Sequence, residues 1–294
     1  MSDKYAVIFA HRTEFPIILM CRVFAVSRAG YYAAQDRAPS KRATADATLA
    51  ATITDTFTAC RRRYGAPRVH QALRTAGHRV GRKRMARLML AAGLKARRRR
   101  RFAVTTDSAH AFPLADNVVA RQFAVGGPVN TVWVSDTTFI PTGEGWLYLA
   151  VVLDLASRFV VGWATSTRND TALVLAALHR ATAIRRPRRG AVHHADSGST
   201  YASHDFPTAL TQQGLTASMS RTGDCWDNAV AVSFFATLEW ELLADERFAT
   251  RAMATRALVP FIDDWYNRKR LHSALGYVSP QTYEQDLTRR RRAA

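Results

Sequence analysis

The sequence has few of the features that mark secreted or membrane proteins. Among 294 residues it contains only three cysteines, which are scattered and show no CxxC spacing: Cys21, Cys60 and Cys225. Such an odd and dispersed set argues against a disulfide framework and against a zinc site. The apolar run at residues 5–10 is interrupted by basic residues, and no stretch approaches the roughly 20 apolar residues of a membrane span. We therefore expect a soluble protein of a reducing cytoplasm with no membrane partner.

Acidic residues and lysine are also scarce. Aspartate and glutamate total 23 against 42 lysines and arginines, which gives a formal net charge of +19. Arginine carries nearly all of the positive charge, because lysine occurs only as Lys4, Lys41, Lys83, Lys95 and Lys269. Guanidinium groups match phosphate oxygens and stack on bases, so a polyanion such as a nucleic acid is the leading interpretation of the partner. A GC-rich genome would explain the preference for arginine over lysine, but it does not explain the excess of positive charge.

The N-terminal part is predicted to be helical. Residues 15–36 form two short apolar-periodic segments, and Ser27 between them can cap the second. We assign residues 1–60 to an N-terminal helical region with a small helix–turn–helix-like segment. A hydrophobic fraction of 48% and the length of the chain allow such a smaller domain beside one large one.

A clearer helix pair follows in residues 61–95, which we assign to a helix–turn–helix-like DNA-binding module. The first helix ends at Gly77 and the second at Gly93. Apolar residues recur at helical spacing in the second helix and make a core face: Met85, Leu88, Met89 and Ala92. Basic residues on the other faces and in the arginine run that follows are the candidate DNA contacts: Arg82, Lys83, Arg84, Arg87, Arg97, Arg98 and Arg99. A solvated basic face is the alternative explanation.

Residues 96–127 are predicted to form a basic linker, because the arginine run is followed by a polar stretch without clear periodicity.

Beyond this linker, three β-rich runs separated by short turns predict an antiparallel meander: TVWVSDTTFI, GWLYLAVVLDL and RFVVGWATS. Alternating helices and strands follow, and the last two helices lie at about residues 227–243 and 251–268. This order predicts a mixed α/β sheet rather than a doubly wound parallel one. We assign residues 128–285 to this core and residues 286–294 to a basic tail.

Two aspartates stand out in the strand-rich region. Asp136 lies inside or at the end of a strand, where aspartate is normally depleted, and Asp196 ends a later strand before a Ser/Gly turn. Each also has an ordinary explanation, since a strand-end aspartate can bond a turn amide and a DSG sequence is a common turn or cap. Asp154 precedes a hairpin turn and has Arg158 close by, so we assign it to turn stabilisation.

Four blocks of sequence together resemble the integrase core of bacterial insertion-sequence transposases. In chain order they are WVSDTTFIPTGEGWLYLAVVLDLASRFVVGW, HHADSGSTY, SMSRTGDCWDNAVAVSFFATLEWEL and YNRKRLHSALGYVSP. The chain is similar to the second-frame product of the large family that encodes its transposase in two overlapping frames, and the N-terminal helical blocks resemble that family too. The resemblance implies a ribonuclease-H-like, mixed five-stranded sheet flanked by helices, with an N-terminal all-helical DNA-binding region.

The resemblance also implies a chemistry. Asp136 and Asp196 would hold two divalent cations, Mg²⁺ with Mn²⁺ as a substitute, because hard cations prefer oxygen ligands. Metals about 3.5–4 Å apart clamp the attacking and leaving oxygens of an in-line phosphoryl transfer. The attacking group would be water for strand cleavage and a 3′-hydroxyl for strand joining, which is the activity of a DDE-type polynucleotidyl transferase.

The third catalytic acid of that family is missing from this chain. The resemblance expects a glutamate separated from the second aspartate by thirty-five intervening residues, and Val232 occupies that position. Glu239 would lie ~10.5 Å further along the helix, and Asp227 would lie about 140° off its face. Asn228 shares the face but offers only a neutral carbonyl. We therefore predict that one metal binds poorly and that strand cleavage is impaired, whether Val232 reflects natural decay or engineering.

Further residues of the matching blocks are candidates for handling DNA: His194, Trp226, Asn228, Arg268, Lys269, Arg270 and His272. For the basic residues, solvated surface charge is the alternative explanation. His194 lies beside the second aspartate and is expected to support it or to contact DNA rather than to bind metal, because hard cations prefer oxygen.

The leading hypothesis is a transposase that binds insertion-sequence ends and catalyses metal-dependent strand cleavage and transfer, in DNA transposition, integration and recombination. Its expected partners are double-stranded DNA at transposon ends and target, the first-frame product of the same mobile element, and further copies of the chain on DNA, in a bacterial cytoplasm associated with the nucleoid. A non-catalytic regulator that binds DNA ends with the same fold is the alternative. A structure-selective nuclease of this fold is a third possibility.

Overall fold

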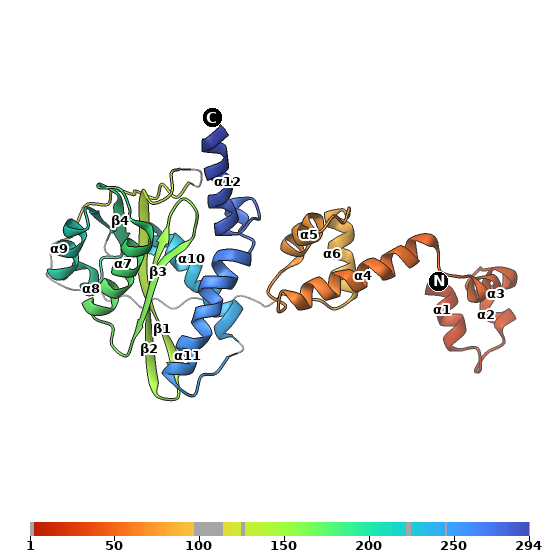
Figure 1. The fold of residues 1–294 in the computed structure, drawn as a ribbon. Helices are drawn as coiled ribbons and strands as arrows, with labels where there is room; N and C mark the ends of the chain where they lie inside the picture. Colours follow the sequence, from red (N-terminus) through yellow and green to blue (C-terminus); the bar gives the residue numbers. More distant parts are fainter. Residues whose placement is uncertain (1–2, 97–113, 125–126, 222–224, 245, 294) are drawn as a thin grey trace. The chain divides into compact units, whose positions relative to one another are not determined.

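The computed structural model describes residues 3–96, 114–124, 127–221, 225–244 and 246–293. The chain divides into two compact units (Figure 1). The smaller unit comprises Met1–Arg61 and Ala72–Lys95, and the larger comprises Arg62–Gln71 and Ala96–Ala294.

The smaller unit is helical. Its helices are α1 (Asp3–Ala10), α2 (Ile17–Val23), α3 (Arg28–Asp36), α4 (Lys41–Ala59) and α6 (Arg82–Ala91), and α5 (Ala66–Thr75) runs from the larger unit into it. The expected cap is confirmed, because the Ser27 Oγ accepts a hydrogen bond from the Gly30 amide at 3.0 Å. Met85, Leu88 and Met89 form the buried face of α6, as their helical spacing predicts, whereas Ala92, expected on the same face, is exposed where the helix ends.

No single helix within the described ranges is long and apolar enough to cross a membrane, although α2 and α3 together pass that test by length and composition as a pair bent by 108°.

A mixed five-stranded sheet forms the centre of the larger unit, in the order β3-β2-β1-β4-β5. The strands are β1 (Val132–Thr142), β2 (Gly145–Asp154), β3 (Val160–Ser166), β4 (Val192–Ala195) and β5 (Thr216–Met219). β1, β2 and β3 pair antiparallel, whereas β4 pairs parallel with β1 and with β5. The predicted meander and the mixed character of the sheet are confirmed.

Both faces of the sheet are covered by helices (Figure 1). The helices of one face are α7 (Thr171–Arg185), α8 (Ser199–Ala202) and α9 (Asp205–Gln212), and those of the other include α10 (Ala229–Leu238) and α11 (Arg251–Val259). Gly162 allows α7 to approach β3 closely, since a Cβ there would overlap the backbone of Ala177. An apolar core thus lies between the sheet and the helices on each of its two faces.

The expected turn role of Asp154 is confirmed. This aspartate is buried, and its Oδ1 accepts hydrogen bonds from the Ser157 amide at 2.8 Å and from the Ser157 hydroxyl at 2.9 Å. These bonds fix the β2–β3 turn, so Asp154 is committed to structure.

The last helices depart from simple α-helices. α10 continues into a π-helical segment, η2 (Glu239–Leu243), and α11 continues into another, η3 (Pro260–Lys269). Pro260 lacks an amide hydrogen, and this loss of one helical hydrogen bond accounts for the change of helix type at that position. α12 (Pro280–Ala293) includes nearly all of the residues that sequence assigned to a basic tail.

Candidate active site

Asp136 lies on β1, and Asp196 directly follows β4, the strand that pairs parallel with β1. β1 and β4 pair Val132 with Val192 and Val134 with His194, and each aspartate follows two residues after the last of these pairs. The Asp136 Oδ1 accepts a hydrogen bond from the Thr137 amide at 2.8 Å. The Asp196 Oδ1 accepts one from the Gly198 amide at 3.1 Å. Strand pairing thus brings together two carboxyls that are sixty residues apart in sequence.

The electrostatics show that the two carboxyls interact. Burial and the negative charge of Asp196 raise the pKa of Asp136 well above its usual range. Burial and the charges of both aspartates also raise the pKa of the Tyr201 phenol. Repulsion between two nearby carboxylates is the condition that a bound divalent cation relieves. In the described part of the chain, however, no group of three or more His, Cys, Asp or Glu side chains is arranged to hold a metal.

Val232 lies on α10, which packs against β1. The helix is fixed there by Asn228, whose Nδ2 donates to the carbonyl oxygen of Ser135 at 2.9 Å. Residues four apart share a helix face, so Val232 lies one turn along on the face that Asn228 presents to β1. Glu239 is exposed where α10 ends. Val232 therefore places an apolar side chain on the helix that packs against β1, at the position where the resemblance expects an acid.

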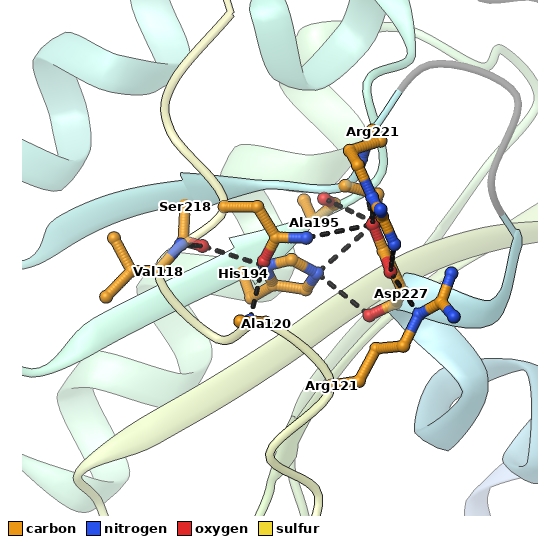
Figure 2. A network of polar contacts seen from close by, with 10 residues as sticks. Val118, Ala120, Arg121, His194, Ala195, Ser218, Arg221 and Asp227 are labelled. Atoms are coloured by element: carbon orange, nitrogen blue, oxygen red, sulfur yellow. Dashed lines mark hydrogen bonds and ion pairs between the residues drawn. The ribbon is translucent and has the colours of Figure 1, made fainter.

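Asp227 cannot replace the missing acid, because its carboxylate is fully engaged elsewhere (Figure 2). Its oxygens accept hydrogen bonds from Arg121 Nε at 2.7 Å, Arg221 Nε at 2.9 Å and Asn117 Nδ2 at 2.8 Å. Arg221 in particular, together with Arg121, holds the pKa of Asp227 far below its usual range. The side chain is 0% exposed.

Sequence reasoning missed the two arginine partners of Asp227. Arg121 lies in the stretch expected to be a basic linker, but residues 114–124 of that stretch are fastened to the core. Val119 is buried in the core, and the Val118 amide donates to Ser218 Oγ at 3.0 Å. No periodicity could reveal these contacts, since they depend on the tertiary position of β5.

His194 is buried within the same network (Figure 2). Its Nδ1 lies 2.9 Å from Ser218 Oγ, and its Nε2 lies 3.0 Å from the carbonyl oxygen of Asp227. Burial lowers the pKa of His194, which keeps the ring neutral. The ring connects β4, β5 and the start of α10, and it is 0% exposed, so it has no surface to offer DNA.

The candidate DNA contacts of the smaller unit lie on α6. Arg82, Lys83 and Arg87 are exposed. Arg84 and Arg87 both pair with Asp46 of α4, at 2.6 and 2.5 Å, so part of their charge is compensated. The candidates Arg97, Arg98 and Arg99 lie outside the described residues.

The candidates of the larger unit fall into two groups. Trp226 is 68% exposed, and Arg268 and Lys269 are exposed as well. Arg270 and His272 are buried instead, and the Arg270 Nε donates to Glu241 Oε1 at 2.9 Å. The two buried residues line a cavity rather than the outer surface.

A mixed sheet with helices on both faces, and two aspartates brought together by β1 and the end of β4, is the arrangement of an integrase-type catalytic core. The model "Integrase core domain" matches residues 128–225, a second model of that description matches 213–280, and "HTH-like domain" matches 44–102.

Sequence relatives define the family of this chain more narrowly. It is 40% identical to an uncharacterized 31 kDa protein of insertion element IS600 from Shigella sonnei, over 90% of this chain and 97% of that protein. It is 38% identical to the transposase InsF for insertion sequence IS3A of Escherichia coli K12, over 96% of this chain and 98% of InsF. The chain therefore belongs to the IS3 family of insertion-sequence transposases, which confirms the resemblance. Among solved structures, the catalytic core domain of BIV integrase aligns with 17% identity and a TM-score of 0.41, over 55% of this chain and 98% of that one.

Proposed function

We propose that this transposase binds the ends of its insertion sequence and cleaves and joins DNA strands through Asp136 and Asp196. The observation that supports this most directly is the position of the two carboxyls, one on β1 and one directly after its parallel neighbour β4, where burial and the charge of Asp196 raise the pKa of Asp136. Membership of a family of transposases with an integrase core supports the same reaction class. A polynucleotidyl transferase needs oxygen ligands at one point of a rigid sheet, and this arrangement supplies two.

The two aspartates fit a divalent cation. Their oxygens are hard ligands, and their mutual repulsion favours a bound Mg²⁺ or Mn²⁺. When bound, such a cation stabilises the charge that develops on the phosphoryl oxygens. Asp136 and Asp196 would hold it, and the amides of Thr137 and Gly198 orient their carboxylates.

Val232 limits this site. A valine supplies no oxygen ligand, so we propose that one of two metals binds poorly and that strand cleavage by this chain is impaired. Among the residues whose placement is described, the nearest acids on the same part of the helix are Asp227, which is paired with arginines, and Glu239, which is exposed beyond the end of α10. Neither compensates for the loss.

DNA binding would involve both units. The HTH-like match covers α6, so we assign Arg82 and Lys83 to contacts with end DNA, together with the exposed Trp226, Arg268 and Lys269 of the larger unit. Phosphate contacts of this kind position the protein and make binding sensitive to salt. We further propose that the chain acts as an oligomer on DNA together with the first-frame product of its element.

A second function is favoured by the same valine. A chain that keeps the fold and the DNA-binding residues but lacks the third acid would bind ends without cutting them and thereby regulate transposition. In this case Asp136 and Asp196 would be remnants of an ancestral site.

Strand-transfer assays with the Val232→Glu variant separate the two functions. We expect the valine form to show little or no strand transfer and Val232→Glu to restore it, with the activity abolished again by Asp136→Asn. Val259→Glu is the matched control, since it makes the same substitution at an exposed valine of a different helix, α11. Full activity of the valine form would refute the impairment, whereas end binding without cutting by both forms would support the regulator.

A further inference from the structure

A cavity of about 570 Å³ lies in the larger unit, beside α10. Its wall carries four arginines from three separate parts of the chain: Arg63 and Arg68 around the start of α5, Arg158 in the β2–β3 turn, and Arg270 at the end of η3. We refer to it as the arginine cavity. The residues around the start of α5 are far from the catalytic core in sequence, so their presence in this wall requires specific contacts.

Those contacts fasten residues 62–71 to the segment that follows η3. The Tyr64 hydroxyl accepts a hydrogen bond from the Leu271 amide at 2.9 Å, and Arg68 Nε donates to the Leu271 carbonyl oxygen at 2.9 Å. The Arg63 guanidinium lies over the Trp265 ring, 4.7 Å from its centroid. Such stacking holds a guanidinium in place.

The charges in the cavity are unbalanced. Glu241 is its one acidic lining residue among those described, and both of its oxygens are engaged, by Arg270 Nε at 2.9 Å and by Trp265 Nε1 at 2.8 Å. Arg270 is thereby compensated and acts as part of the wall. Of the other lining arginines, Arg68 and Arg158 leave an excess of positive charge in the described part of the wall.

His272 lies close to several of these charges. Burial and the positive charges of Arg270, Arg68 and Arg158 lower the pKa of its imidazole well below the usual value. The ring is therefore neutral and adds no further charge to the cavity. Three guanidiniums thus act on one buried side chain.

Arg158 has a hydrogen-bonding group to spare. Its Nη2 donates to the carbonyl oxygen of Phe123 at 2.6 Å, but its Nη1 is buried and has no hydrogen-bond partner within the described residues. A buried donor without an acceptor costs about 1–3 kcal/mol. A ligand with acceptor oxygens in the cavity would remove that penalty and balance the charge.

We propose that the arginine cavity binds a phosphate group of a DNA strand. Guanidinium forks from separate segments match the several oxygens of a phosphate, whereas a carboxylate offers only two. Ala229, Val230 and Ser233 of α10 also line the cavity, so a phosphate held here lies against the helix that carries Val232. The assignment to DNA rests on the proposed function, whereas phosphate binding itself does not.

The test uses the full chain and two probes, inorganic phosphate in calorimetry and duplex DNA in fluorescence anisotropy. The variants are Arg158→Gln and Arg63→Gln, with Arg158→Lys as a conservative form that keeps the charge but loses the fork. Arg256→Gln is the matched control, because Arg256 is exposed on α11 and does not line the cavity. Circular dichroism and thermal unfolding verify that each variant is folded.

We expect saturable phosphate binding by the wild type, weakened about tenfold or more in Arg158→Gln and Arg63→Gln. DNA should displace the phosphate, and each of these variants should lose about tenfold in DNA affinity with a salt slope lower by about 1. Arg256→Gln should retain phosphate binding.

Equal phosphate binding by the wild type and the cavity variants would overturn the proposed site. Loss of phosphate binding with unchanged DNA affinity would overturn the assignment to DNA. Strand transfer by Val232→Glu with an intact cavity tests the proposed function separately.

Discussion

Asn228 donates from its Nδ2 to the carbonyl oxygen of Ser135 at 2.9 Å, one residue before Asp136. This bond joins the first turn of α10 to the strand that carries the first aspartate. Val232 follows one turn later on the same face of the helix. The contact between the start of α10 and the strand of Asp136 is therefore in place, and we propose that an acid at position 232 would complete the site.

Asn228→Ala tests this positioning role. We expect it to lower the free energy of unfolding by about 1–2 kcal/mol, because the buried Ser135 carbonyl loses its donor. In the Val232→Glu background it should also reduce strand transfer about tenfold or more per folded molecule, because the helix is no longer fixed beside Asp136.

Asn267→Ala is the matched control for that experiment. Asn267 is also buried, and it bonds both the amide and the carbonyl of Val160 on β3. Its loss should destabilise the fold without lowering strand transfer per folded molecule. Equal activity losses in the two variants would argue that Asn228 acts through stability alone.

Asp136→Asn is predicted to stabilise the metal-free protein. The folded-state pKa of Asp136 is raised. The stability that this carboxyl contributes is therefore fully present below the pKa of the unfolded state, about 4, and is lost as pH rises through the folded-state pKa. The variant removes this penalty, so its unfolding free energy should exceed that of wild type by about 1–2 kcal/mol at neutral pH and equal it in acid. Urea denaturation across this pH range measures the difference, with Asp286→Asn on α12 as control. A constant difference at all pH values would contradict the account.

Asp227→Asn is predicted to have the opposite effect. The folded-state pKa of Asp227 is depressed, so its ion pairs stabilise the protein above the pKa of the unfolded state, and that stability is lost only as pH falls through the depressed value. At neutral pH we expect a loss of about 2 kcal/mol, moderated because Arg121 and Arg221 are 44% and 62% exposed. Denaturation at neutral and at acidic pH should show that the difference in unfolding free energy between Asp227→Asn and the wild type becomes smaller in acid. A variant as stable as wild type at neutral pH would show that these pairs do not hold residues 114–124 and the start of α10 together.

Sequence alone predicted the parts of the fold that depend on local patterns. The alternation in TVWVSDTTFI and the helical spacing of Met85, Leu88 and Met89 correspond to β1 and to the buried face of α6. Ser27 caps its helix as expected, because a cap is set by neighbouring residues. The proximity of Asp136 and Asp196 was predicted only through the resemblance to a family, since parallel pairing of distant strands leaves no local signal.

The features that sequence did not predict depend on tertiary contacts. Arginine has the same polar signature whether it is solvated or paired, so neither the role of Arg121 at Asp227 nor the burial of Arg270 against Glu241 could be read from composition. The arginine cavity likewise depends on the docking of Tyr64 onto Leu271. Nor did the helical periodicity indicate the π-helical segments after Leu238 and Val259.

Calorimetric titration with Mn²⁺, of the wild type and of Val232→Glu in the presence of end DNA, measures whether Val232 weakens the metal site. We expect weak binding at Asp136 and Asp196 in the valine form. In Val232→Glu we expect binding tighter by about tenfold or more and a second bound ion, and in Asp136→Asn the loss of both ions. Two tightly bound ions in the valine form would contradict the proposed impairment.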